Sequence, residues 1–257
     1  MISSKQFEIP CLHRVHQGTP QGVHKISHSI GMSIELKELI ARLEKLNREA
    51  IIEGREDRSI LVTFDDGWID SLLLIDFFDR AKKLQPVLFL THQQLTGDSR
   101  LLPLSRLYAW CDHWSLDLDC IKELGISRSV LKSIPEDLQH SILDSLEIPG
   151  SYNSSQVLEL ATITELRDRG WIIGSHAHDH HDLRNTDLRE LELGLEKAYD
   201  STIKAGGLPW LAWPEGRCSQ EICEIASKVG FEKQFSLNIE SGKINFPGLE
   251  HREIWSE

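Results

Sequence analysis

Short apolar segments alternate with amphipathic helical patterns along most of this 257-residue chain. This alternation constrains the fold more than any other feature, because a buried parallel strand is a near-continuous apolar run and a surface helix has one apolar stripe. It favours a mainly parallel α/β architecture. Strands are expected at 9–15, 60–64, 86–91, 171–174, 208–213 and 231–237.

The amphipathic segments between these runs predict helices. They are expected at 35–49, 68–84, 154–169, 187–204 and 220–230, with Ser154 or Ser155, Thr186 and Ser219 as N-caps. The middle of the chain, 97–153, has short helical patterns without strong strands. We interpret it as a helical excursion inserted between barrel units, within a single domain that spans 1–257.

Polar side chains gather where three of the expected strands end. Asp65, Asp66 and Gly67 follow the run 60–64, and four histidines fall within the six residues 176–181. Pro214 and Glu215 follow the run 208–213. In a parallel α/β barrel the carboxyl ends of the strands meet on the face that carries the active site. We therefore expect these groups to lie together.

The residue types in these segments predict metal-assisted hydrolysis. One carboxylate and two imidazoles are a common ligand set for a catalytic zinc that keeps one position open. A second, unligated carboxylate supplies the base. Consecutive strand residues point to opposite sides, so one of Asp65 and Asp66 is expected to be a ligand and the other the base. His176 and His180 share a face if the segment is a helical turn; His181 is an alternative to His180.

Composition narrows the partners and the location. The formal net charge of −12 argues against nucleic acid or an anionic membrane as a main partner. Neither an apolar leader nor a membrane-spanning run is visible, so the protein is expected to be cytoplasmic. Reduced thiols are expected as well, because the cysteines are odd in number and scattered: Cys11, Cys111, Cys120, Cys218 and Cys223.

The sequence resembles the polysaccharide deacetylases of the NodB homology type, carbohydrate esterase family 4. Thr-Phe-Asp-Asp-Gly at 63–67 resembles the first family motif, and Gly-Ser-His-Ala-His-Asp-His-His-Asp-Leu at 174–183 resembles the second. Leu-Ala-Trp-Pro-Glu-Gly-Arg at 211–217 resembles the third, and Cys-Leu-His-Arg-Val at 11–15 resembles the opening of many bacterial members. The resemblance implies a distorted (β/α) barrel of seven or eight strands.

By motif position, the resemblance implies that Asp66, His176 and His180 bind a divalent metal. Zinc suits this ligand set best, although iron, cobalt, nickel or manganese also fit. Asp65 would be the base, and the backbone N–H of Glu215 would hold the oxyanion. The implied reaction is hydrolysis of an N-acetyl group on a sugar or saccharide precursor. Glu215 replaces a tyrosine of the family. Ala212 stands where some members have an arginine, so Asp65 has another partner or none.

Several assignments stay open at this level. His13 and His251 are alternative general acids, and His92 is a weaker candidate. Asp179 and Asp182 are candidates for orienting the ligand imidazoles. Trp68, Trp213 and Pro214 are expected to line the substrate cleft, although core packing is the more usual role of tryptophan. Two functional alternatives remain: a deformylase or other C–N hydrolase, and a metal-binding pseudoenzyme that recognises saccharide.

Overall fold

The computed structural model describes residues 7–19, 23–98, 100–114, 116, 119–126, 128–148, 156–237 and 244–256. Within these residues, seven strands close into a barrel in the order β1-β4-β5-β6-β7-β8-β9, and every pair is parallel. The strands are β1 (Ile9–Leu12), β4 (Ile60–Asp65), β5 (Leu84–Leu90), β6 (Ile172–Ser175), β7 (Trp210–Ala212), β8 (Lys233–Leu237) and β9 (Leu249–Ile254). The predicted (β/α) barrel is confirmed, with seven strands.

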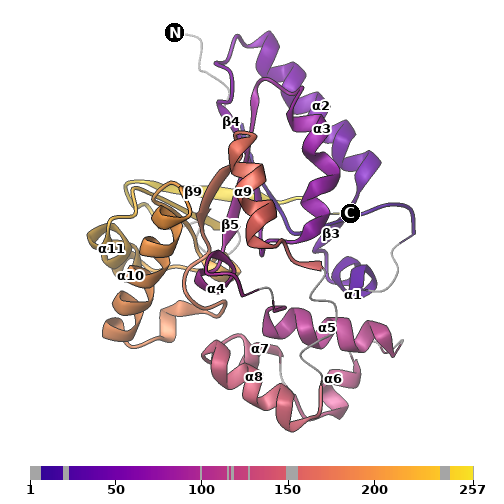
Figure 1. Ribbon diagram of the computed structural model, residues 1–257, viewed down its shortest axis with the longest axis vertical. Coiled ribbons are helices and arrows are strands. Elements are labelled where there is room, and N and C mark those ends of the chain that lie inside the picture. The colour runs from indigo at the N-terminus through magenta and orange to yellow at the C-terminus, as the bar shows by residue number, and fades with distance from the viewer. Residues whose placement is uncertain are drawn as a thin grey trace.

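Helices pack around the barrel, as the apolar stripes in the sequence require. Leu39, Leu43, Leu46 and Ala50 recur at helical spacing on α2 and are all buried. Figure 1 shows α2 and α3 on one side of the barrel and α10 and α11 on another. The helices of this layer are α2 (Leu36–Ile52), α3 (Ile75–Phe78), α4 (His92–Leu95), α9 (Leu160–Asp168), α10 (Leu188–Lys204) and α11 (Gln220–Val229).

The expected strand 9–15 is divided at His13. The backbone of β1 pairs with β4 and β9, whereas β2 (Arg14–His16) leaves the barrel and pairs with β3 (Ser33–Glu35). His13 therefore stands at the carboxyl end of a barrel strand.

The expected helix 68–84 is wrong over most of its length. A 3-10 helix, Ile69–Leu74, leads into the single turn of α3, and Leu84 already belongs to β5. Polar side chains explain the difference: Ser71 Oγ donates to the backbone oxygen of Trp68, and Asp70 is held by Arg14. Local side-chain bonds of this kind compete with regular helix.

Two helix starts also differ from expectation. Asp187, not Thr186, caps α10, because its carboxylate accepts from the N–H groups of Arg189 and Glu190. Helix α9 begins at Leu160 after Glu159. The predicted caps Ser154 and Ser155 lie outside the described residues.

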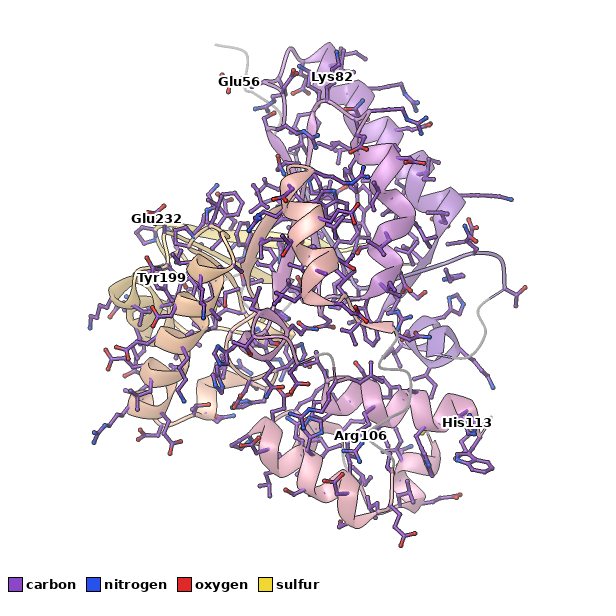
Figure 2. The ribbon with its side chains drawn as sticks, viewed as in Figure 1. Glu56, Lys82, Arg106, His113, Tyr199 and Glu232 are labelled. Atoms are coloured by element: carbon purple, nitrogen blue, oxygen red, sulfur yellow. The ribbon has the colours of Figure 1, made fainter. Side chains whose placement is uncertain are left out.

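A helical lobe occupies the segment expected to be an excursion, below the barrel in Figure 1. It consists of α5 (Pro103–His113), α6 (Asp119–Glu123), α7 (Arg128–Leu131) and α8 (Glu136–Ser145). Its core joins Leu107, Cys111 and Leu143 to Ile26 of α1 (Val23–Ser29). Arg106 lies inside the lobe (Figure 2) and donates to Asp144 Oδ1 at 2.6 Å, which ties α5 to α8. It remains a prediction that the lobe and the barrel form a single domain.

The barrel interior is filled by apolar side chains. Phe89 and Phe235 pack there with Val87 and Ala212. Gly174 makes room for Phe89, because a Cβ at this position would come within 2.6 Å of the Phe89 ring. None of the helices within the described residues is both long and apolar enough to cross a membrane.

Candidate active site

The carboxyl ends of the barrel strands surround a cavity of about 290 Å³. His13 follows β1, Asp65 ends β4, and His176 follows β6. The cavity is lined by polar groups from each of these strand ends and from the turn after β7: His13, Asp65, Asp66, His176, His180 and Glu215. The structure therefore brings together side chains that the sequence separates by up to about two hundred residues.

Asp65 is 3% exposed and is held by Arg252 of β9. Arg252 Nη1 donates to Oδ1 at 2.6 Å and Nη2 donates to Oδ2 at 2.8 Å, and Arg252 itself is completely buried. Burial alone would raise the pKa of Asp65, but the guanidinium and the neighbouring His176 lower it to about 2. A bidentate pair of this kind fixes both the charge and the orientation of the carboxylate.

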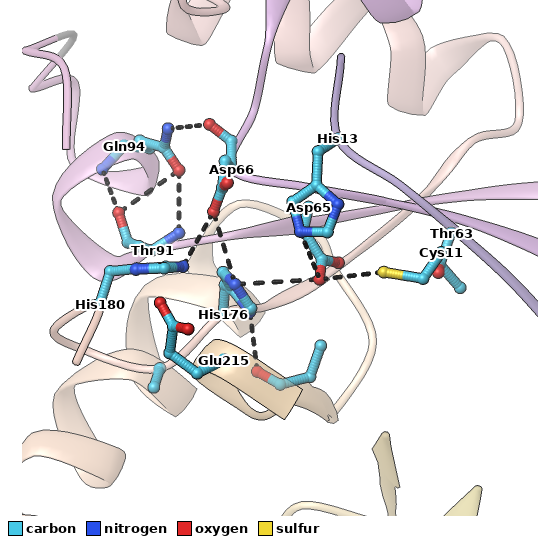
Figure 3. A network of polar contacts seen from close by, with 12 residues as sticks. Cys11, His13, Thr63, Asp65, Asp66, Thr91, Gln94, His176, His180 and Glu215 are labelled. Carbon is cyan, nitrogen blue, oxygen red and sulfur yellow. Dashed lines mark hydrogen bonds and ion pairs between the residues drawn. The ribbon is translucent and has the colours of Figure 1, made fainter. Parts of the chain in front are cut away.

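Asp66 stands on the turn that leaves β4. Its backbone has φ of 67°, and Gly67 follows with φ of 63°. Gln94 Nε2 donates to the Asp66 backbone oxygen at 2.6 Å. A Cβ on Gly67 would lie 2.7 Å from Leu90 and 2.9 Å from Gln94, so glycine is required where this turn packs. The turn sends the carboxylates of Asp65 and Asp66 toward the same imidazole, that of His176 (Figure 3).

His176 presents one ring nitrogen to this cluster. Its Nδ1 lies 2.9 Å from the backbone oxygen of Ala212. Because a carbonyl can only accept, Nδ1 carries the hydrogen and the lone pair is on Nε2. That Nε2 is 3.5 Å from Asp66 Oδ1. An imidazole oriented by a backbone carbonyl in this way is typical of a metal ligand.

His180 reaches the same oxygen from the other side, with Nε2 3.1 Å from Asp66 Oδ1 (Figure 3). The segment between the two histidines is irregular, with Ala177 at φ of 64°, so the two histidines do not share a helical turn. The four-residue spacing works through a loop that turns both rings inward. The rings of His176 and His180 lie 5.0 Å apart, centroid to centroid.

The three side chains Asp66, His176 and His180 fit a divalent metal. Their ligand atoms all lie within 4.8 Å of one another. Asp66 Oδ1 is buried, and two imidazole nitrogens face it, at 3.5 Å from His176 and 3.1 Å from His180. Burial would lower the pKa of His180, but Asp66 and then Glu215 raise it to about 9. The surroundings therefore favour a positive charge at this point, as a cation site requires.

Glu215 lies on the turn after β7 with φ of 57°. Burial would raise its pKa, but His180 and the ammonium of Lys132 lower it, so the carboxylate is charged. Lys132 follows α7 of the lobe and forms an ion pair with Glu215. The lobe thus supplies the counter-charge for a carboxylate at the mouth of the cavity.

Of the two tryptophans and the proline that were expected to line the cleft, one lines the cavity and two are buried. Trp68 lines the cavity, and the Arg14 guanidinium lies 3.9 Å from the centre of its ring. Trp213 is completely buried, and its indole N–H donates to Gln234, so its predicted place in the cleft is wrong. Pro214 is buried beside it and does not line the cavity.

The other histidine and aspartate candidates point away from the cluster. His92 stacks on His178 with ring centres 4.9 Å apart, and His251 bonds Ser236 Oγ. The alternative ligand His181 bonds Thr186. Asp179 contacts His178, while Asp182 pairs with Arg184 and Arg217, so neither orients a ligand imidazole.

Arg252 is the site residue whose role the motifs alone do not reveal. Of the two alternatives left open by Ala212, the structure shows the first: Asp65 has another partner, and it comes from the last strand. None of the motifs quoted from the sequence includes Arg252, so they do not indicate which acid this arginine meets.

Comparison with known proteins agrees with this geometry. The polysaccharide deacetylase family model matches residues 148–233, which contain the histidine loop and the turn after β7. A search of curated proteins gave no match.

Solved structures of low sequence identity share the fold. The Streptococcus pyogenes deacetylase PplD, solved with acetate, is 14% identical, with 98% of this chain and 94% of that chain covered at a TM-score of 0.58. IcaB from Ammonifex degensii is 15% identical, with 97% and 91% covered and a TM-score of 0.55. A de-N-acetylase from Aggregatibacter actinomycetemcomitans is 14% identical, with 96% and 93% covered and a TM-score of 0.56. At these identities the structures establish the fold, and the resemblance inferred from the motifs is confirmed.

Proposed function

We propose that this protein, which matches the polysaccharide deacetylase family model over residues 148–233 and shares the fold of solved deacetylases, is a metal-dependent hydrolase that removes N-acetyl groups from a sugar or saccharide precursor. The observation that carries the proposal is the cluster of Asp66, His176 and His180 beside the Arg252-bound carboxylate of Asp65. One group of side chains suits a cation and the adjacent carboxylate suits a base, as metal-assisted amide hydrolysis requires.

Asp66, His176 and His180 would hold the metal, and zinc suits this ligand set best. When bound, the metal supplies a Lewis acid that polarises the amide carbonyl and makes water a stronger nucleophile. His176 is held for this role by the Ala212 carbonyl, and Asp66 by the turn at Gly67.

Asp65 takes the proton from the attacking water in this proposal. Its Oδ2 lies 3.9 Å from His176 Nε2, so the carboxylate borders the ligand cluster without belonging to it. Arg252 lowers the pKa of Asp65 and so keeps it able to accept a proton at neutral pH. Arg252 donates to both carboxylate oxygens of Asp65 from one side, so the lone pairs that it does not use point away from the guanidinium.

His13 donates a proton to the departing amine. Its Nε2 lies 4.0 Å from Asp65 Oδ2, and its ring lines the cavity. His251, the alternative acid, is bound to Ser236 and does not line the cavity. The geometry therefore favours His13.

Glu215 contributes its backbone N–H to the oxyanion. A carboxylate so close to the reaction would oppose that charge, and the ion pair with Lys132 offsets it. Trp68, on the cavity wall, provides a surface on which a sugar ring can stack.

Acetate release from N-acetylated sugars, nucleotide sugars and oligosaccharides by zinc-reconstituted protein tests the proposal. Asp65→Asn is the matched control, since it keeps the shape of the base and all three proposed ligands. Release by the wild type that is lost in the control, with metal still bound, supports the reaction. A metal-loaded wild type that leaves these substrates intact but hydrolyses N-formyl or other non-acetyl amides would instead indicate a different C–N hydrolase. Metal binding with no turnover of any amide would indicate a saccharide-binding pseudoenzyme.

The cytoplasmic location of the protein stays a prediction, which cell fractionation tests.

A further inference from the structure

The loop that carries both histidines of the cluster is held from two directions. Its first half is bound to the barrel. The backbone N–H of His176 donates to the Leu90 carbonyl at 2.7 Å, and the N–H of His92 donates to the Ala177 carbonyl at 3.0 Å. Strand β5 and the start of α4 therefore place His176.

The second half of the loop is bound to the helical lobe. The backbone N–H of His180 donates to Glu136 Oε2 at 3.2 Å, and the N–H of Asp182 donates to the Lys132 carbonyl at 2.7 Å. Buried backbone donors need such acceptors, and this irregular segment has no helix or strand partner to supply them. The segment 132–136 thus lies alongside the half of the loop that contains His180.

Glu136 is the most deeply buried acid among the described residues, at 1% exposed. Carboxylates are almost never buried to this degree unless they are paired. Its Oε2 receives the His180 N–H, and its Oε1 lies 3.6 Å from His140 Nε2. Glu136 also stands in the first turn of α8, where the helix dipole favours a negative charge. Asp137, next in the same turn, is exposed.

We propose that Glu136 is a positioning residue for His180, so that the helical lobe is part of the apparatus that binds the metal. A hydrogen bond to the His180 backbone N–H limits where its imidazole can point, and outer partners that orient a metal ligand typically change metal affinity by about 10- to 100-fold. The inference rests on the proposed metal-dependent function. It makes His176 the ligand placed by the barrel and His180 the ligand placed by the lobe.

Titration of zinc into the metal-free full-length protein, with a chelator as competitor, tests the proposal. Glu136→Met fills a similar volume with only a weak acceptor, whereas Glu136→Gln keeps a carbonyl oxygen that can accept the His180 N–H. Asp137→Asn is the matched control in the same helical turn. Circular dichroism confirms that each variant is folded.

Glu136→Met is expected to bind zinc about 10- to 100-fold more weakly than the wild type, with Glu136→Gln much closer to the wild type and Asp137→Asn unchanged. Activity of Glu136→Met is expected to recover when zinc is saturating, which a general loss of structure would not allow. Unchanged zinc affinity in Glu136→Met would overturn the proposal. Equal weakening in the Met and Gln variants would also overturn it, because the charge rather than the bond to His180 would then matter. A wild type that binds neither zinc nor another divalent metal would refute the proposed function itself.

Discussion

Replacing Arg252 with methionine is the most direct test of how the candidate base is held. Arg252→Met keeps most of the side-chain volume in the barrel but leaves the buried carboxylate of Asp65 without its two strongest hydrogen bonds. Removing one partner of a buried ion pair typically costs about 3–5 kcal/mol, because the other charge stays buried and unpaired.

The lowered pKa of Asp65 reflects the same interaction, together with the neighbouring His176. Its value is lowered from 3.8 to about 2, which corresponds to about 2 kcal/mol in favour of the charged form. Because the folded-state pKa is the lower one, this stabilisation is fully present above the unfolded value of 3.8 and is lost as the pH falls through about 2. Removing Arg252 raises the pKa of Asp65, so the acidic limb of the kcat/KM profile should move to higher pH.

Urea unfolding at neutral pH measures the stability effect, with Asp65→Asn/Arg252→Met as the comparison. The double variant has no unpaired charge and should be more stable than Arg252→Met alone. The reasoning is refuted if Arg252→Met loses less than about 1 kcal/mol, or if the double variant is no more stable than the single one. An unmoved acidic limb in Arg252→Met would separately show that Asp65 is not the group that titrates in catalysis.

Three further predictions concern the metal cluster, the barrel interior and the contact between lobe and cavity. His176→Ala should abolish retention of zinc, measured as metal content after dialysis, whereas His178→Ala should not, because His178 stacks on His92 away from the cavity; equal losses would contradict the ligand assignment. Gly174→Ala should lower the free energy of unfolding by about 1–3 kcal/mol through overpacking against Phe89, while Gly194→Ala, where a Cβ would be 3.4 Å from His178, should be neutral or stabilising. Lys132→Met should lower kcat by leaving Glu215 charged and unpaired at the cavity, and adding Glu215→Gln should restore part of the loss; no rescue would argue against the electrostatic explanation.

The positions of the proposed metal ligands could be predicted because each is tied to a local pattern. The apolar run 60–64 ends at the carboxylates, and the histidines follow a second apolar run, so the parallel fold itself places both at the carboxyl ends of strands. The path of the loop from His176 to His180 could not be predicted. It depends on acceptors at Leu90 and Glu136, which are distant in sequence and carry no motif of their own.

The incorrect assignment of Trp213 has a similar physical reason. A tryptophan beside a site motif is compatible with either a cleft or a core, and what decides is whether a partner for its indole N–H is buried with it. Gln234 on β8 is that partner. The ion pair between Lys132 and Glu215 could not be predicted from the sequence either. It joins the lobe to the barrel, and its geometry follows only from how α7 packs.

Arg252 and Ala212 together show that a positive charge beside Asp65 is easier to predict than the strand that carries it. In a closed barrel, inward-pointing side chains from several strands converge on the same axis, so a guanidinium on any of them can reach the carboxylate of Asp65. At position 212 the side chain packs among Phe89 and Phe235, and only the backbone oxygen serves the site, by orienting His176. The side chain there is free to be small, provided that the positive charge enters from elsewhere, as it does from β9. A buried carboxylate such as that of Asp65 needs a cation beside it on physical grounds alone. That requirement, more than any motif position, indicates that a variant lacking Arg252 would leave this carboxylate buried and unpaired.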